Sequence, residues 1–204
     1  MNEVLAVGIA YLLGSIPFGY LAGRASGIDI RTVGSGNIGT TNVFRTLGRR
    51  WGIAVLVADV GKGLVAVLIA KELTGGVWPV IAAVAAVLGH VAPVWLRFRG
   101  GKGVAVAGGA IIGLMPLASL ILLAVWIVVL ALTRYVSAAS IVGAVAFTPL
   151  AWALGYGWQY IVFAALVSVL VLVRHRSNMK RLATGKELRV DLRRGSRPGG
   201  EAGA

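Results

Sequence analysis

Apolar residues of this chain gather in long runs, separated by shorter stretches rich in glycine and basic residues. A helix needs about 20 apolar residues to cross the hydrocarbon core of a bilayer. Measured against that length, the pattern predicts an all-α integral membrane protein. Because Glu3 rather than a basic segment precedes the first run, we expect a retained span and not a cleaved signal peptide. The runs lie at 4–22, 53–73, 77–96, 104–133, 136–154 and 157–173.

The run at 104–133 is too long for one ordinary span. Gly113 and Pro116 interrupt it, so it is either one tilted helix or two short ones. Lysine and arginine gather in three clusters, at 24–50, at 97–102 and from residue 174 onward. Short basic loops stay in the cytoplasm, so all three clusters should lie on that side of the membrane.

This shared side decides between the two alternatives. A single crossing by 104–133 would place Arg134 and the basic C-terminal segment outside, whereas two crossings keep both in the cytoplasm. We therefore expect a break near 114–116 and seven transmembrane helices, with the N-terminus outside and the C-terminus cytoplasmic. Residues 104–114 would extend only about 16 Å, so a re-entrant pair with the same sidedness is the alternative.

Composition narrows the class of partner. The chain is 58% hydrophobic and carries a net charge of +13, from 20 Lys and Arg against 7 acidic residues. In a soluble chain this balance would suggest nucleic acid. Here the charges lie between apolar runs, so anionic lipid or a phosphorylated substrate is the expected partner. The absence of cysteine excludes disulfides, thiolate metal sites and a cysteine nucleophile.

The second basic cluster contains the sequence GGKG at 100–103. Glycines let a backbone turn tightly and bring its N–H groups to an anion. Lys102 has glycine on both sides and no aliphatic neighbour to cover, so we expect its ammonium to contact a phosphate. For Arg97 and Arg99 the simpler interpretation is snorkelling to the membrane interface, and we expect it to hold for at least one of them.

The first basic cluster contains SGNIGTTN at 35–42. Such a segment is either an ordinary turn-rich linker or an anion site. A helix that begins near 40–42 would present free N–H groups, and Arg45 would follow about one turn later to meet the same anion. The Walker-type spacing of a nucleotide-binding loop is absent here and around Lys102.

The third cluster reads RHRSNMKR at 174–181. Neighbouring positive charge should lower the pKa of His175 and leave a neutral imidazole that can accept a hydrogen bond or a proton. The alternative is an interfacial histidine with no chemistry. On a continuing helix, Asn178 would share the face of His175.

Few polar residues fall inside the runs. Asp59 and Lys62 are three positions apart on one helix and can pair, and we favour a buried pair that fixes helix packing. We expect His90 to be a satisfied core histidine beside a kink at Pro93, and not a metal ligand. Asp29 would serve a turn or the cytoplasmic site.

Three motifs thus occur in order: SGNIGTTN followed by Arg45, GH at 89–90 leading to GGKGVA at 100–105, and RHRSNMKR followed by Gly185 and Glu187. Together they resemble the bacterial acyl-phosphate:glycerol-3-phosphate acyltransferase family. The resemblance covers about residues 14–187 and departs at Thr40, where the family more often has alanine, a mild change. We expect one transmembrane catalytic domain over 1–187 and a basic, disordered cytoplasmic tail over 188–204.

The resemblance implies a reaction in the bacterial inner membrane, with the active site facing the cytoplasm. The sn-1 hydroxyl of glycerol 3-phosphate attacks a long-chain acyl phosphate, which gives lysophosphatidic acid and phosphate in the first step of phospholipid synthesis. Carried over motif by motif, the catalytic residues are Ser35, Arg45, Lys102, His175 and Asn178. The implied substrate-binding residues are Gly36, Asn37, Thr41, Asn42, Gly101, Gly103, Ser140 and Arg181.

An acyl phosphate is already activated, so the protein need only position the reactants and neutralise charge. The His-x4-Asp pair of other glycerolipid acyltransferases is missing, because Trp95 and Lys180 stand where an aspartate would follow His90 and His175. The resemblance implies that a substrate phosphate oxygen accepts the proton instead. We expect no metal and no organic cofactor. The expected partners are the two substrates and membrane lipids, not nucleic acid.

Two other classes of function compete with this one. A carrier for a phosphorylated solute should place its binding groups near the bilayer midplane, where only Asp59 and Lys62 lie. A structural protein that binds anionic lipid through its basic loops would explain the charge but not the serine, asparagine and glycine residues.

Overall fold

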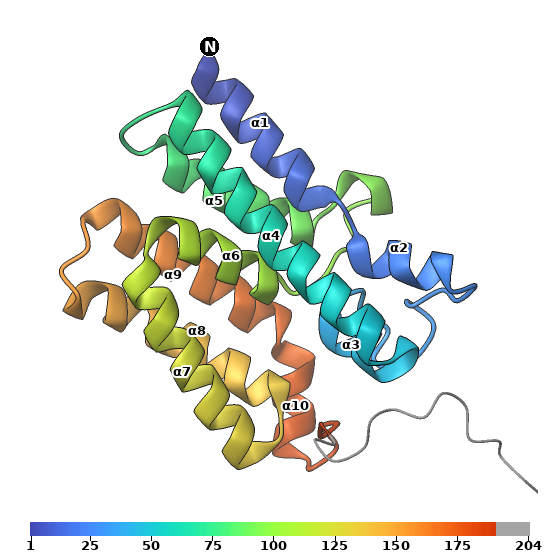
Figure 1. Ribbon diagram of the computed structural model, residues 1–204. Helices are drawn as coiled ribbons and strands as arrows, with labels where there is room; N and C mark the ends of the chain where they lie inside the picture. The colour runs from blue at the N-terminus through green and yellow to red at the C-terminus, as the bar shows by residue number, and fades with distance from the viewer. Residues whose placement is uncertain (191–204) are drawn as a thin grey trace, which may run out of the picture.

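The structure is a computed structural model that describes residues 1–190, and the regular elements of that part of the chain are all helical (Figure 1). Long helices are connected by short turns, with a longer glycine-rich loop between α2 and α3. The elements are α1 (Asn2–Ser15), α2 (Phe18–Ala25), α3 (Thr40–Leu47), α4 (Arg49–Leu73), α5 (Trp78–Val91), the 3-10 helix η1 (Val94–Leu96), α6 (Val104–Leu114), α7 (Pro116–Thr133), α8 (Val136–Ala153), α9 (Trp158–Arg174) and α10 (Arg176–Ala183).

The all-helical membrane class expected from the sequence is confirmed. Within residues 1–190, five helical stretches are long and apolar enough to cross a membrane: α1 with α2, α4, α5 with η1, α7 and α8. The pair α9 and α10 also qualifies, with a bend of 57° between the two helices, and α6 is a shorter apolar helix. Seven spans require that α9 and α6 both be counted. That number, and the orientation of the termini, stay predictions.

The break expected in the run at 104–133 is present at Met115, between α6 and α7. Pro116 occupies the first position of α7, where its missing N–H removes no helical hydrogen bond. The chain reverses its direction at this break (Figure 1). Two other expected runs are interrupted: 4–22 is divided at Ile16 and Pro17, and 77–96 leaves the α-helix at Val91 because Pro93 follows.

Helices α4 and α6 pack with their backbones in contact. A methyl group added at Gly63 would lie 2.1 Å from the Val106 carbonyl oxygen, and one added at Gly109 would lie 1.9 Å from the Val60 carbonyl oxygen. Only glycine permits such a crossing, which is the small-residue packing typical of membrane helices. The close contact fixes α6, and with it the GGKG segment that leads into the helix.

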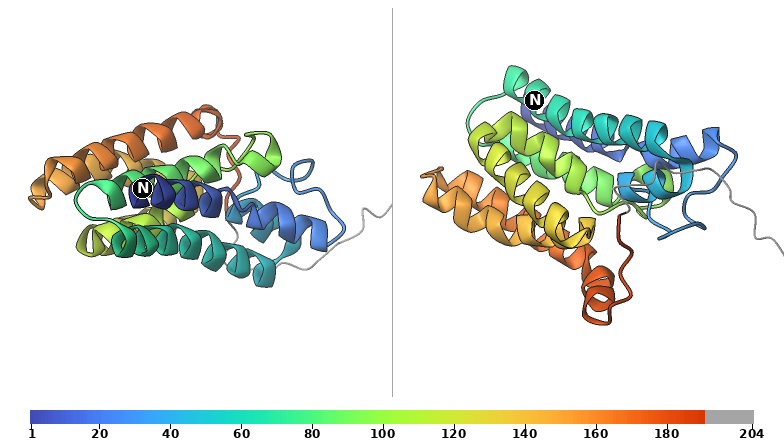
Figure 2. Two further views of the ribbon diagram at one scale, coloured as in Figure 1. Left: turned by 90° about the horizontal axis from the view of Figure 1, so that it is seen from above. Right: turned by 60° about the horizontal axis from the view of Figure 1, so that its bottom comes forward.

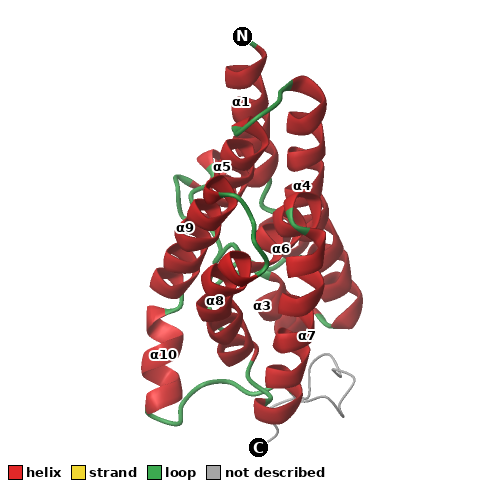
Figure 3. Cartoon of the chain, turned by 90° about the vertical axis from the view of Figure 1, so that its left-hand side faces the viewer, coloured by secondary structure: helices red, strands yellow, loops and turns green. Residues whose placement is uncertain are grey.

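Helix α6 lies between two groups of helices. It packs against α4 and α5, which also contact α1, and it contacts α7, which begins the antiparallel series α7, α8 and α9 (Figures 1 and 2). Helix α10 continues from α9 at the end of the molecule opposite the N-terminus (Figure 3). Of the expected tail at 188–204, residues 191–204 lie outside the described residues.

Candidate active site

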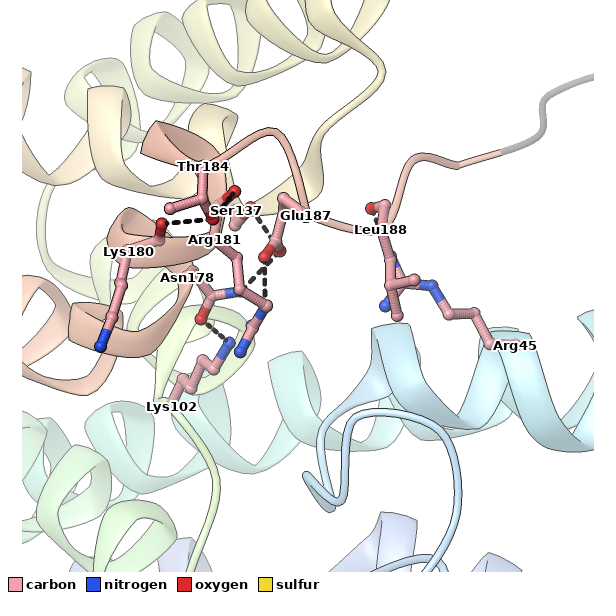
Figure 4. Close-up of polar contacts among 9 residues, drawn as sticks. All are labelled: Arg45, Lys102, Ser137, Asn178, Lys180, Arg181, Thr184, Glu187 and Leu188. Atoms are coloured by element: carbon pink, nitrogen blue, oxygen red, sulfur yellow. Dashed lines mark hydrogen bonds and ion pairs between the residues drawn. The ribbon is translucent and has the colours of Figure 1, made fainter.

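Three segments that are distant in sequence meet at one network of polar side chains (Figure 4). The Lys102 ammonium donates to Asn178 Oδ1, and Asn178 Nδ2 donates to Glu187 Oε1 over 2.6 Å. Arg181 Nε donates to the other oxygen of Glu187 over 2.7 Å. The GGKG segment is thereby joined to α10 and to the segment that follows it.

Glu187 is the acidic centre of this network. Its side chain is only 5% exposed and accepts a third hydrogen bond, from Ser137 Oγ at 2.8 Å. Burial raises the pKa of Glu187, but the hydrogen bonds from Asn178, Ser137 and Arg181 outweigh burial and hold the pKa below its usual value. The carboxylate is therefore ionised at neutral pH and offsets part of the positive charge around it.

Lys102 stands two residues before the start of α6. Gly103, which lies between them, caps that helix with a φ of 85°, in the left-handed region. Burial lowers the pKa of Lys102 to about 8, with Glu187 opposing the shift and Arg181, Arg45 and Arg174 adding to it. The ammonium thus remains the major form at pH 7. An anion that replaced the contacts of Lys102 would raise its pKa again.

His175 lies at the junction of α9 and α10 and is 3% exposed. Burial, and then the charge of Lys102, lower the pKa of His175 to about 4, so the ring is neutral at pH 7. The sequence predicted this direction from neighbouring charge, but burial is the larger cause. Nδ1 lies 2.8 Å from the Val171 carbonyl oxygen, which can only accept, so Nδ1 carries the hydrogen and Nε2 is the acceptor.

The Gly100–Gly101 turn is held by Arg174. Arg174 Nη2 donates to the Gly100 carbonyl oxygen over 2.9 Å, and Arg174 Nε donates to the Gly101 carbonyl oxygen over 3.2 Å. Both carbonyl groups are therefore satisfied by one guanidinium, which also adds positive charge near Lys102.

Loop one, the glycine-rich loop at 26–39 between α2 and α3, is shaped by Asn42, which is 1% exposed. Its Nδ2 donates to the carbonyl oxygens of Ile30 and Val33, each over 3.1 Å, and its Oδ1 accepts from the Ser35 N–H at 2.8 Å. Both N–H groups of the amide are thus used inside the loop, so the structure favours a role for Asn42 in shaping the loop over contact with substrate. Asn37 acts similarly, since its Oδ1 accepts from the Gly39 N–H at 2.8 Å.

Helix α3 begins at Thr40, which confirms the expected helix start, and no side chain caps it. Thr41 lies in its first turn. Arg45 lies one turn further on and donates to the Leu188 carbonyl oxygen over 2.9 Å (Figure 4). Loop one is thereby joined to the segment that carries Glu187.

A polar cleft of about 480 Å³ lies between loop one, the GGKG segment and α9. Asp29 and Arg31 pair across 2.6 Å at its edge, and hydrogen bonds from Arg31 lower the pKa of Asp29 to about 2. Asp29 therefore serves a turn and also lines the cleft. Ser35 is exposed next to Gly36 in the lining. The cleft is lined by Asp29, Arg31, Thr32, Gly36, Ile38, Phe98, Arg99, Gly100 and Arg174.

This arrangement suits anionic substrates better than a metal. Within residues 1–190, no three His, Asp or Glu side chains come together as potential metal ligands. Several cations instead surround one carboxylate, and a neutral imidazole lies next to them.

Comparison with known proteins agrees with the arrangement. A family model described as glycerol-3-phosphate acyltransferase matches residues 4–185. The chain belongs to this family. Glycerol-3-phosphate acyltransferase of Desulforudis audaxviator is 49% identical over 94% of this chain and 97% of its own length. The Geobacter sulfurreducens protein of the same name is also 49% identical, over 93% of this chain and 98% of its own.

Two solved structures have the same fold. Both are crystal structures of PlsY, described as an integral membrane glycerol 3-phosphate acyltransferase. The glycerol 3-phosphate form has a TM-score of 0.91 and 39% identity over 94% of this chain and 96% of its own. The lysophosphatidic acid form has a TM-score of 0.87 and 38% identity over the same shares. The family resemblance seen in the motifs is thus confirmed.

Three residues of the site were not predicted as site residues. The sequence could have indicated Glu187, because it is an isolated acidic residue in a strongly basic segment. It could also have indicated Arg174, which directly precedes His175. Nothing in the sequence indicated Ser137, since a lone serine at the start of an apolar run is ordinary. Ser140, the predicted residue one turn further along α8, donates to the Val136 carbonyl oxygen over 2.8 Å and lies outside the network at Glu187.

Proposed function

We propose that this member of the family transfers a fatty acyl group from acyl phosphate to the sn-1 hydroxyl of glycerol 3-phosphate. The observation that carries the proposal is the network in which Lys102, Asn178 and Glu187 join the second and third motif segments, with Arg45 of the first motif joined to Leu188 beside it. Both substrates carry phosphate, and this is where Lys102, Arg45, Arg174 and Arg181 gather their positive charge. The names of the relatives support the acceptor substrate.

The reaction needs charge neutralisation more than a strong base. The sn-1 oxygen attacks the carbonyl carbon, the bond from that carbon to the phosphate oxygen breaks, and the hydroxyl proton passes to a phosphate oxygen. The products are lysophosphatidic acid and inorganic phosphate. Negative charge grows on the departing phosphate, where Lys102, Arg45 and Arg181 stabilise it most strongly in the transition state.

Neutral His175 and Asn178 orient the acceptor in this proposal. Nε2 of His175 accepts a hydrogen bond from a glycerol hydroxyl, and Asn178 exchanges its contact with Lys102 for one with substrate. The Ser35 and Thr41 hydroxyls, together with the backbone of Gly36, Gly101 and Gly103, hold phosphate or carbonyl oxygens. Asn37 and Asn42 keep loop one in the shape that this requires.

The acyl chain has a place close to the polar network. An apolar groove of about 290 Å³ runs between α5 and α9, open at the surface that faces lipid. Val173 at its end directly precedes Arg174, and a methyl group of Val87 lies 3.2 Å from where a side chain at Gly103 would begin. The occupant that fits this groove is the tail of the acyl phosphate, entering from the bilayer. Its lining includes Val84, Val87, Leu88, Leu166, Leu170 and Val173.

Purified protein tests the reaction directly. Palmitoyl phosphate with glycerol 3-phosphate should release phosphate and form lysophosphatidic acid. Lys102→Ala should lose most turnover while it elutes from gel filtration like the wild type. Activity with acyl-CoA and none with acyl phosphate would contradict the proposed donor, and a normal rate for Lys102→Ala would remove Lys102 from the site.

We further propose that the site faces the cytoplasm of a bacterial inner membrane, with seven spans and an external N-terminus. The three basic segments support this orientation. The chain has no cysteine, so single cysteines introduced at Arg134 and Ser196 give unambiguous labelling sites. A membrane-impermeant thiol reagent should fail to label either one in intact cells and should label both after lysis. Labelling of both in intact cells would reverse the orientation.

A further inference from the structure

Three buried polar side chains, on α4 and α5, take no part in the proposed reaction. Asp59 and Lys62 on α4 and His90 on α5 are 1%, 5% and 5% exposed. The Lys62 ammonium forms an ion pair with Asp59 Oδ1 at 2.9 Å and hydrogen bonds with the Ile16 carbonyl oxygen at 2.7 Å and with His90 Nδ1 at 3.0 Å. The expected pair thus has a third member, 28 residues away in sequence.

Lys62 determines how the His90 ring is oriented. An ammonium only donates, so Nδ1 of His90 accepts from it and the hydrogen of the neutral ring lies on Nε2. The two hydrogen bonds and the ion pair of Lys62 are all made inside the protein, and the residue is 5% exposed, so the ammonium is not presented to a transported solute. This arrangement argues against the carrier hypothesis and gives the ammonium a fixed position.

His90 contacts the GGKG turn twice. Its carbonyl oxygen accepts from the Gly101 N–H at 3.1 Å. Its ring packs against the α-carbon of Gly101, because a methyl group added there would lie 2.2 Å from Nε2. Gly101 immediately precedes Lys102. A change in the angle of this ring would therefore be transmitted to Lys102 through a single peptide unit.

We propose that Asp59, Lys62 and His90 form a positioning group that fixes the Gly100–Gly101 turn through the contacts of His90 on α5. Arg174 holds the two carbonyl groups of the same turn, so the turn is held by Arg174 on one element and by His90 on another. Apolar residues would pack α4 against α5 without the cost of burying charge, and such replacements are often neutral or stabilising. A role in orienting His90 explains why these positions carry charge.

This inference rests on the proposed acyl transfer, and it is tested by separating stability from turnover. The double variant Asp59→Asn with Lys62→Met removes both charges together and leaves no unpaired ion. We expect its thermal unfolding temperature in detergent to be at least that of the wild type. We expect kcat to fall about ten- to a hundredfold with little change in KM for glycerol 3-phosphate, because small misplacement of a catalytic group has effects of this size.

Two single variants at His90 cover the case in which the double variant does not fold. His90→Gln keeps an acceptor for Lys62, whereas His90→Leu removes it. We expect His90→Gln to stay within about threefold of wild-type kcat and His90→Leu to lose about tenfold or more. Ser168→Ala is the matched control, since Ser168 is also a buried polar residue in a span but donates to Ala144, away from the turn; it should retain wild-type kcat.

The possible outcomes are distinct. If the wild type shows no acyl transfer, the proposed function fails before the variants are compared. If the wild type is active and the folded double variant has wild-type kcat, the positioning role is wrong. The role is also wrong if His90→Gln and His90→Leu are equally active, or if activity falls only in proportion to the amount of folded protein.

Discussion

Titration of Lys102 should be visible in the pH dependence of acyl transfer. Burial lowers the pKa of this lysine to about 8 in the free protein. Only the protonated amine can neutralise phosphate, so activity requires the form that is lost as pH rises. With this pKa, about nine-tenths of the molecules carry the ammonium at pH 7 and about one-tenth at pH 9. We therefore expect kcat/KM to fall about tenfold across these two units.

The profile of kcat should differ from that of kcat/KM. In the complex with substrate, phosphate lies against Lys102 and raises its pKa, so the break in kcat should occur at higher pH. Phosphate monoesters lose their second proton near pH 6, so the charge on glycerol 3-phosphate is almost constant between pH 7 and 9. Rates of phosphate release with palmitoyl phosphate, measured from pH 6.5 to 9.5 at saturating and at limiting glycerol 3-phosphate, give both profiles.

Lys102→Arg provides the control, because a guanidinium stays charged to about pH 12. Its absolute rate will be lower if its shape fits poorly, but its profile should be flat up to pH 9. A wild-type kcat/KM that does not change between pH 7 and 9 would refute the reasoning. A break that persists unchanged in Lys102→Arg would assign the titration to another group.

Four other predictions address stability and specificity. His175 has a pKa of about 4, below the 6.5 of an unfolded chain, so it contributes stability that is complete above pH 6.5 and is lost as pH falls toward 4; thermal unfolding of His175→Gln should depend less on pH in this window, and an identical slope would contradict the buried neutral ring. Gly109→Ala should lower stability by about 1–3 kcal/mol because the added methyl meets the Val60 carbonyl, whereas Gly108→Ala, with open space around it, should not; equal melting temperatures would refute the backbone contact between α4 and α6. Glu187→Gln should cost about 2 kcal/mol in chemical unfolding through weaker hydrogen bonds to Arg181 and Asn178, while Glu72→Gln on the surface of α4 should cost almost nothing; similar values for both would argue against the network. Leu170→Trp should raise KM for palmitoyl phosphate more than for octanoyl phosphate because it narrows the groove between α5 and α9, and an equal effect on both would move the acyl chain elsewhere.

Hydrophobic pattern and charge predicted the positions of most helices. The break at Met115 followed from one proline and from the requirement that the basic segments share a side. In the run at 77–96, Pro93 predicted a kink, but hydropathy did not predict that α5 ends at Val91, because residues 92–96 are mostly apolar. Hydropathy reports what is buried in lipid, whereas helix ends depend on backbone hydrogen bonds.

The site was predictable where its residues belong to local motifs. Lys102, His175 and Asn178 stand in short segments of unusual composition, and the structure brings them together. The pairing of Asp59 with Lys62 followed from their spacing on one helix. Their contact with His90 depends on how α4 packs against α5, and the contact of Ser137 with Glu187 depends on the path of the chain after α10. No local pattern records either arrangement.

The segment 187–190 ties the site together and follows all the described helices in the chain. Its residues hold Arg45 through the Leu188 carbonyl, Ser137 through Glu187, and Arg134 through the Val190 N–H. During synthesis, each of these helices therefore leaves the ribosome before the network can close. A chain interrupted before Glu187 would have the described helices but an open site, so acyl transfer requires this segment as well as the helices.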